Sequence, residues 1–216
     1  TYEWHERLGD PMAFWIGLAI FILASIVAER LLPPQYKKFM PILVMCVLTF
    51  LGLFRYEIGT DYDWYIVLFD TVKIDDLYPE PTFLLLVEFL HQFHFSYQVM
   101  FIAYELPIML LLWSGIRYYT KDTEVQILIV ALYYCLQYFF SLNGIRQGLS
   151  MVLIFWGYRY CLERSLWKYL LVVALAASMH YSAVVAAVLY FVPNRVFSWY
   201  KYAIVFILTF IVFKLN

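Results

Sequence analysis

Charged residues are scarce in this sequence. Asp, Glu, Lys and Arg make up 14% of its 216 residues, against about a quarter in ordinary soluble domains. Hydrophobic residues make up 64%, so too few charges remain to cover the surface of a water-soluble globule of this size. The long apolar runs predict an all-α fold, that of a polytopic integral membrane protein.

Basic tracts and cysteines are also few, and this narrows the range of functions. The net charge is −1 and no cluster of Lys and Arg has the density that binding to a phosphate backbone requires. Cys46, Cys135 and Cys161 lie in or beside apolar runs, without the spacing of metal ligands or of a disulfide framework. We therefore expect no nucleic-acid partner, no metal and no cofactor.

Seven apolar runs are candidate membrane-spanning helices, since a span needs about 20 mostly apolar residues. They are residues 12–32, 39–54, 97–113, 125–142, 148–161, 169–192 and 202–213. An eighth run, residues 82–95, is short and is interrupted by Glu88, His91 and His94. We expect this run to be re-entrant or to lie in the membrane interface, because short elements are tolerated where they line a polar cavity.

The distribution of charge in the connecting segments predicts the orientation. Lys and Arg in short loops mark the cytoplasmic side, and they gather in three turns, around Arg30 and Lys37, around Arg117, and around Arg164. Residues 55–81 instead contain seven acidic residues against two basic ones. The predicted topology therefore has an external N-terminus and forms a single domain over residues 1–216. Residues 55–81 and the motif "SLNGIRQGLS" then share the external side.

The motif "SLNGIRQGLS" predicts a polar helix face. Asn143, Arg146, Gln147 and Ser150 are spaced at i, i+3, i+4 and i+7, which places all four on one side of a helix. Such a stripe in a lipid-embedded helix is expected to face protein or water. The alternative is that Arg146 extends to the lipid headgroups, but this leaves the other three polar residues unexplained.

The polar segment "RYEIGTDYDWY", residues 55–65, places Arg55 and Asp61 among aromatic residues. Rings and carboxylates together suit sugars, although an interfacial belt of Trp and Tyr is an alternative for the aromatics. Arg55 and Arg146 converging on one external cavity would match a diphosphate, because guanidinium groups pair with phosphate oxygens and keep their charge. His180, near the middle of the run 169–192, is either a proton acceptor or a hydrogen-bonded packing residue. Glu105, within the run 97–113, is expected to pair with an arginine.

These motifs carry a resemblance to a known family. "RYEIGTDYDWY", "YPEPTFLLL", "SLNGIRQGLS" and "SMHYSA" occur in an order that resembles the EpsG family of bacterial polysaccharide polymerases, over about residues 12–192. That family is similar in role to the Wzy polymerases of O-antigen and capsule. Its members are longer, so the resemblance implies that these residues form the N-terminal part of a longer polymerase.

The resemblance implies a glycosyltransferase of the bacterial inner membrane. It would join oligosaccharide repeats carried on undecaprenyl diphosphate into exopolysaccharide, capsule or O-antigen at the outer face. Its partners would be these lipid-linked oligosaccharides, membrane lipids and other membrane proteins of polysaccharide biosynthesis. A flippase for the same lipids and a membrane acyltransferase with His180 as base are the alternatives. A flippase is disfavoured because we find no internal repeat.

The candidate site follows from the motifs and the resemblance together. The expected catalytic residues are Arg55 and Arg146, which would hold the diphosphate, and Asp61 or His180, which would take the proton of the acceptor hydroxyl. The expected substrate-binding residues belong to the same motifs. They are Gly59, Thr60, Tyr62, Tyr65, Asn143 and Gln147.

Overall fold

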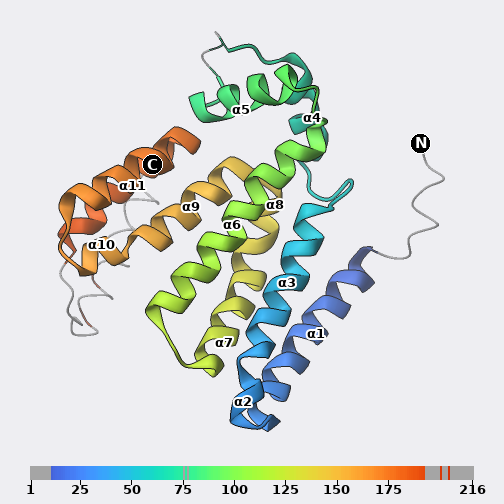
Figure 1. Cartoon of the computed structure of the whole chain (residues 1–216), viewed down its shortest axis with the longest axis vertical. Helices are drawn as coiled ribbons and strands as arrows, with labels where there is room; N and C mark the ends of the chain where they lie inside the picture. The colour runs from blue at the N-terminus through green and yellow to red at the C-terminus, as the bar shows by residue number, and fades with distance from the viewer. Residues whose placement is uncertain (1–10, 75, 77, 193–199, 201–203, 205–216) are drawn as a thin grey trace.

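The computed structural model describes residues 11–74, 76, 78–192, 200 and 204, and all regular secondary structure among these residues is helical (Figure 1). The all-α fold class is therefore confirmed. The elements, in chain order, are α1 (Pro11–Leu31), α2 (Pro34–Lys37), α3 (Phe39–Leu53), α4 (Tyr62–Thr71), α5 (Pro81–Gln92), α6 (Tyr97–Tyr119), α7 (Thr123–Tyr133), the π-helical η1 (Tyr134–Tyr138), α8 (Phe139–Asn143), α9 (Ile145–Gly157), α10 (Arg159–Leu162), α11 (Leu166–Met179) and the 3₁₀-helical η2 (Tyr181–Phe191).

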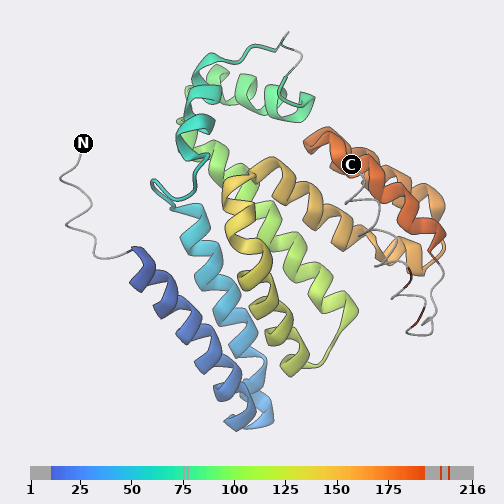
Figure 2. The same ribbon diagram turned by 180° about the vertical axis from the view of Figure 1, so that it is seen from behind.

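Four helical segments are long and apolar enough to cross a membrane. They are Met12–Leu31, Pro34–Leu53, Tyr97–Tyr119 and Thr123–Asn143. They agree with four of the seven predicted spans. In Figures 1 and 2, α6 lies between α3 and α9, and the rod formed by α7, η1 and α8 packs against α1 and α3.

The other three predicted spans are not found as continuous long helices among the described residues. In the run 148–161, α9 has 13 residues, about 20 Å of helix, which is less than the roughly 30 Å of a bilayer core. The run 169–192 is broken at His180, which has extended backbone (φ −156°, ψ 118°) between α11 and η2. The run 202–213 lies outside the described residues except for Ile204.

Tyrosine hydroxyls form hydrogen bonds between the rod of α7, η1 and α8 and the helices α1 and α3. Tyr134 donates to the Trp15 carbonyl of α1 at 2.9 Å, and Tyr138 donates to the Leu48 carbonyl of α3 at 2.8 Å. Both tyrosines are buried and lie four residues apart, so they share one face of the rod. Buried hydroxyl groups need such partners, and here each one joins two helices.

Ion pairs and a hydrogen bond connect the helix ends and turns at one end of the bundle. Arg30 of α1 pairs with Glu124 of α7 at 2.5 Å, and the buried carboxylate of Glu29 accepts from the Thr123 hydroxyl at 2.6 Å. Glu29 also lies 3.8 Å from Lys37 of α2. The end of α1, α2 and the turn from α6 to α7 therefore lie together. This is the end that the distribution of Lys and Arg assigns to the cytoplasm.

Helices α4 and α5 cover the opposite end of the bundle. Figure 1 shows α5 lying across this end, close to the last turn of α11, instead of along the bundle axis. This placement agrees with the prediction that residues 82–95 do not cross the membrane. The junction of α8 and α9 and the end of α11 lie at this same end (Figures 1 and 2), and the break at His180 directly follows α11. Both predicted polar motifs thus belong to one end of the molecule.

Candidate functional site

Two groups of polar residues occupy the end of the bundle covered by α4 and α5. We call residues 55–61, which connect α3 to α4, the docking turn. We call Tyr78, Glu80, Arg146 and His180 the Glu80 cluster. The docking turn contacts the chain just before α9, and the Glu80 cluster lies where three other helix ends meet.

The docking turn is attached to the end of α8. Arg55 is only 2% exposed; its guanidinium donates a hydrogen bond to the Leu142 carbonyl and lies over the Phe101 ring at 4.1 Å. The Thr60 amide donates to the Asn143 side-chain oxygen at 2.6 Å. Burial lowers the pKa of the Arg55 guanidinium, and the carboxylate of Glu105 acts in the opposite direction. The turn therefore depends on Arg55 and Asn143 for its position.

Gly59 is required by the geometry of this turn. Its φ of +102° is a conformation that L-residues rarely adopt. A Cβ atom at this position would also lie 2.6 Å from the side-chain oxygen of Asn143. Gly59, Thr60 and Asn143, which the sequence suggested as substrate-binding residues, thus contact one another, and this contact holds the docking turn on α8.

The Glu80 cluster joins the ends of three helices. Glu80 immediately precedes α5, Arg146 is the second residue of α9, and His180 immediately follows α11. One carboxylate oxygen of Glu80 accepts from Arg146 Nη1, and the other contacts His180 Nδ1 at 2.8 Å. Arg146 Nη2 donates to the Tyr78 hydroxyl at 2.9 Å. A single carboxylate therefore joins two of the four candidate catalytic residues.

The cluster is buried at its centre and accessible at His180. Glu80 is 2% exposed and Arg146 is 7% exposed, whereas the His180 side chain is 30% exposed. The Arg146 guanidinium lies 5.2–5.8 Å from the rings of Tyr65, Tyr78 and Phe83. In this weakly polar surrounding, each charge of the buried pair depends on the other for its stability.

The bond between Glu80 and His180 fixes the tautomer of the imidazole. A carboxylate has no proton to donate, so Nδ1 of His180 must be the donor. Nε2 of neutral His180 then has a free lone pair that can accept a proton. A carboxylate that orients a histidine in this way is the arrangement that supports general-base catalysis in hydrolytic triads.

Sequence reasoning missed Glu80 as a functional residue. From the sequence alone it is one of the seven acidic residues of the external segment and part of the motif "YPEPTFLLL", without a role of its own. A signal was present, because Glu80 is placed between Pro79 and Pro81 in "YPEP". Proline at the first position of a helix is favourable, and it sets Glu80 at the start of α5. Nothing in the spacing showed that Arg146 and His180 would contact it.

The predicted polar face of "SLNGIRQGLS" is wrong in one respect. Gly144 (φ −92°, ψ 68°) separates α8 from α9, so Asn143 does not lie on the helix that contains Arg146. Ser150 is buried on α9 four residues after Arg146, and Gln147 is partly buried. The prediction failed because it continued one helix through a glycine, the residue type at which helices often end.

The two candidate arginines are connected through aromatic rings. Arg55 lies over Phe101, Arg146 faces Tyr65, and the rings of Phe101 and Tyr65 are in edge contact at 6.3 Å. Among the described residues, Arg55 and Arg146 share no hydrogen-bonding partner. Arg55 Nε and Nη2 and Arg146 Nε are buried without a partner in the described part of the chain. The described residues therefore leave the hydrogen-bonding capacity of these donors unused.

The remaining candidates lie around these two groups. Asp61 is exposed and accepts from the Thr60 hydroxyl at 3.2 Å. Tyr62 is buried and its ring stacks on Phe101 at 5.1 Å. Glu105 is buried against Gly52, and within the described residues neither of its carboxylate oxygens has a hydrogen bond. It interacts electrostatically with Arg55, without a direct bond, so the predicted pairing with an arginine is a longer-range one.

Comparison with known proteins gives a match at the level of a family. The model of the EpsG family matches residues 37–216. No curated protein and no solved structure matches this chain. The matched range includes the whole docking turn and the whole Glu80 cluster.

Proposed function

This chain belongs to the EpsG family, and from that membership and the Glu80 cluster we propose that it is a membrane-embedded polysaccharide polymerase. It transfers a glycan from a lipid diphosphate to the sugar hydroxyl of a second lipid-linked repeat. The observation that supports this best is the bond from Glu80 to both Arg146 and His180. It sets a proton acceptor beside a guanidinium, the two groups that such a transfer needs.

The proposed reaction is a displacement at the anomeric carbon of the donor. The acceptor hydroxyl oxygen forms the new glycosidic bond while the bond between the anomeric carbon and the diphosphate oxygen breaks. His180 Nε2 takes the proton of the acceptor hydroxyl, and the electron pair of the broken bond stays on the diphosphate. The lipid diphosphate leaves, and the proton on His180 passes to water before the next turnover.

Glu80 couples the two halves of this reaction. As His180 becomes an imidazolium, its bond to Glu80 becomes an ion pair, as in the orienting carboxylate of a catalytic triad. The negative charge of Glu80 is then shared, which leaves more of the positive charge of Arg146 to stabilise the leaving diphosphate. Arg146 Nε, buried without a partner among the described residues, is the donor available for that contact.

Arg55 and Asp61 have secondary roles in this proposal. Arg55 Nε and Nη2 provide further donors for the diphosphate, and the bond from Arg55 to the Leu142 carbonyl positions them. Asp61 is the second candidate for taking the proton, since it is exposed at the start of α4. The bond that orients His180 favours His180 over Asp61.

The proposed location is the outer face of the bacterial inner membrane. The Glu80 cluster lies at the end of the bundle opposite α2 and the turn from α6 to α7 (Figure 1). Those turns contain Arg30, Lys37 and Arg117 and are expected on the cytoplasmic side. The proposed partners are lipid-linked oligosaccharides, bilayer lipids and other membrane proteins of polysaccharide biosynthesis.

The test is the lipid-linked sugar profile of a strain that lacks this gene, complemented with wild-type or His180→Asn protein. We expect the deletion strain to export single repeats without polymer, and only the wild type to restore polymer on gels. Repeats retained on the cytoplasmic side would indicate a flippase and overturn the proposal. Normal polymer with altered acylation would indicate an acyltransferase and would overturn it as well.

A further inference from the structure

An apolar groove begins beside the Glu80 cluster and follows the bundle towards its other end. It has a volume of about 310 Å³ and is lined by residues of α5, α6, α9 and α11. Thr82 and Met179 line it, and these lie two residues after Glu80 and immediately before His180. The Thr82 hydroxyl also donates to the Ser178 carbonyl at 2.8 Å. The groove and the cluster therefore meet where the first turn of α5 contacts the last turn of α11.

Two helix faces run along the groove, and the one on α9 starts in the Glu80 cluster. On α9, Leu149 and Leu153 follow Arg146 at i+3 and i+7 and line the groove, so all three share one face. On α6, Pro107 and Leu111 follow Tyr104 at the same spacing and also line it. A ligand with one charged end and one apolar chain could place the charged end beside Arg146 and Tyr104 and the chain along these two faces.

Tyr104 joins the groove to the cluster electrostatically. Its side chain lines the groove, and its hydroxyl is within electrostatic range of Arg146 and Glu80. This hydroxyl and Arg146 Nε are buried donors that have no partner among the described residues. Buried polar groups are rarely left without partners. The Tyr104 hydroxyl in the wall of the groove, with the Arg146 guanidinium within its electrostatic range, indicates a ligand with acceptor oxygens at that end.

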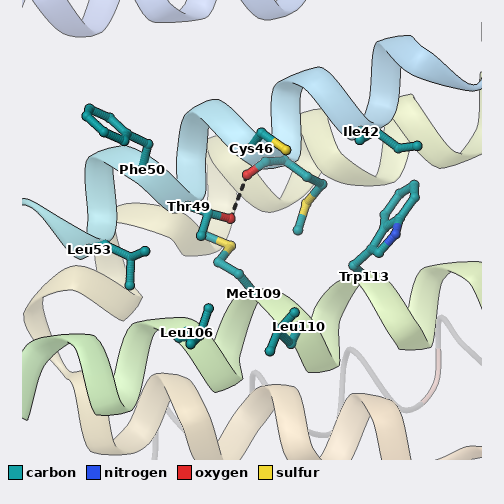
Figure 3. Close-up of a pocket in the computed structure, with 10 residues that line it drawn as sticks. Ile42, Cys46, Thr49, Phe50, Leu53, Leu106, Met109, Leu110 and Trp113 are labelled. Carbon is teal, nitrogen blue, oxygen red and sulfur yellow. Dashed lines mark hydrogen bonds between the residues drawn. The ribbon is translucent and has the colours of Figure 1, made fainter.

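Two other apolar hollows of the bundle lack this polar end. One lies between α3 and α6 and has a volume of about 360 Å³ (Figure 3). Figure 3 shows that the Thr49 hydroxyl in its wall donates to the backbone of its own helix. The other, of about 320 Å³, is lined by α6, α7, η1 and α9. In its wall Tyr133 and Gln137 are both hydrogen-bonded. Neither hollow has in its wall, among the described residues, a buried hydroxyl without a partner, as the groove has in Tyr104, so this group and not volume distinguishes the groove.

We propose that the groove holds the first part of the isoprenoid chain of a polyprenyl diphosphate, with the diphosphate at Arg146 and Tyr104. This inference rests on the proposed function and adds the place where the lipid substrate binds. The charge of Arg146 matches the diphosphate, and the apolar faces of α6 and α9 match the chain. The groove orients the lipid so that its diphosphate reaches His180 and Arg146 together.

The test uses a sugar-free polyprenyl diphosphate with a photoreactive diazirine in its chain. The purified chain in lipid nanodiscs is irradiated with this probe, and the labelled residues are located by mass spectrometry. We expect labelling of α6, α9 and α11 at the groove, suppressed by unlabelled polyprenyl diphosphate but not by polyprenol or phosphatidylglycerol. Ala103→Phe, which places a ring in the groove, is expected to reduce labelling about tenfold.

Matched variants separate a blocked groove from a damaged fold. Cys46→Phe makes the same kind of change in the hollow between α3 and α6 and is expected to leave labelling at the groove unchanged. Leu111→Trp fills the groove farther from the cluster. It should therefore weaken labelling by the polyprenyl probe while leaving labelling by a short geranyl diphosphate probe intact.

The outcomes distinguish this inference from the proposed function. Equal labelling of the groove and of the hollow between α3 and α6 would show an ordinary lipid-facing surface and overturn the inference. Suppression of labelling by phosphatidylglycerol would do the same. An unlabelled groove would also overturn it, because another segment or a bilayer lipid then occupies the space. Because the probe carries no sugar, labelling does not depend on polymerase activity. A deletion strain that exports single repeats would thus keep the proposed function even where the groove fails this test.

Discussion

The docking turn and the Glu80 cluster lie at the same end of the bundle, and each contains one buried arginine, but their bonds differ in kind. Arg55 and the Thr60 amide bind a carbonyl and a side chain at the end of α8, so these bonds fix the path of the chain. The main bonds of the Glu80 cluster run between side chains from three separate helix ends. Groups held in this way can rearrange when a proton or a ligand arrives.

This comparison separates the residues that fix the path of the chain from those that could take part in a reaction. A histidine with a free ring nitrogen and 30% side-chain exposure belongs to the Glu80 cluster. In the docking turn, by contrast, the carboxylate of Asp61 makes no hydrogen bond to Arg55 within the described part of the chain. We therefore expect changes in the Glu80 cluster to lower turnover, and changes in the docking turn to lower stability and protein level. The four predictions below test that division, from the largest expected effect to the smallest.

Glu80→Ala is expected to have the largest effect, because it removes the partner of both Arg146 and His180. Loss of one member of a buried ion pair costs about 3–5 kcal/mol of stability, since the other charge is left uncompensated. We expect a lower melting temperature in detergent and no polymer on gels. Glu88→Ala, an exposed acid on the same helix, is the control. Equal melting temperatures for the two variants would show that Glu80 does not hold the cluster together.

His180→Asn is expected to abolish most activity while leaving the fold intact. The amide of Asn can still donate to Glu80, but it has no ring nitrogen to take a proton. Loss of a general base typically slows a reaction by roughly 10²–10⁴-fold. The measurement is polymer formed per amount of membrane protein, with His94→Asn at an exposed position as the control. Polymer at the wild-type rate would leave His180 as a packing residue and favour Asp61 as the base.

Arg146→Lys and Arg55→Lys together compare the two groups of residues. Lysine keeps the charge but not the planar group with several donors. For Arg146→Lys we expect turnover to fall by roughly 10²–10³-fold at normal protein level, as for loss of one donor in other oxyanion sites. For Arg55→Lys we expect mainly less protein in the membrane, because the bond to Leu142 is lost. The readouts are polymer length on gels and membrane protein level. Full-length polymer from Arg146→Lys at normal protein level would contradict a role for Arg146 in turnover, and a fall in turnover per protein from Arg55→Lys would contradict the purely positional effect expected there.

Gly59→Ala is expected to have the smallest effect and to act on stability alone. The methyl group would approach Asn143 and force alanine into a left-handed conformation, which costs about 1–3 kcal/mol. We expect a lower melting temperature with unchanged polymer formed per folded protein. Gly17→Ala is the control, since a Cβ atom there has nothing within 4 Å. A selective fall in turnover at constant stability would instead give Gly59 a direct role in binding substrate.

Much of the fold could be predicted because hydropathy and charge act locally. Four predicted spans agree with helices long enough to cross a bilayer, and the run 82–95 contains most of the short α5 at the end of the bundle. The predictions failed where one residue ends a helix inside a segment expected to be continuous, the polar face of "SLNGIRQGLS" or the run 169–192. Gly144 and His180 each end a helix, and neither break changes the hydropathy that a window of residues measures.

The candidate site could be predicted only in part. Arg146 and His180 were recognised because a cation and a histidine inside apolar runs are unusual. That Thr60 and Asn143 bind substrate stays a prediction, and the structure adds that they bind each other, a contact that spacing along one helix does not reveal. Glu80 was missed because it looks like the other acidic residues of its segment until its partners are known.

The sequence by itself determined that this protein is an all-α membrane protein and which two ends of the bundle carry which charges, since burial of apolar residues and exposure of charges depend on composition along the chain. Only the tertiary structure decided that Glu80 binds Arg146, 66 residues later, and His180, 100 residues later. Helical periodicity relates residues within one helix. Contacts between separate helix ends depend on how α5, α9 and α11 pack, and that packing places the proton acceptor beside the guanidinium.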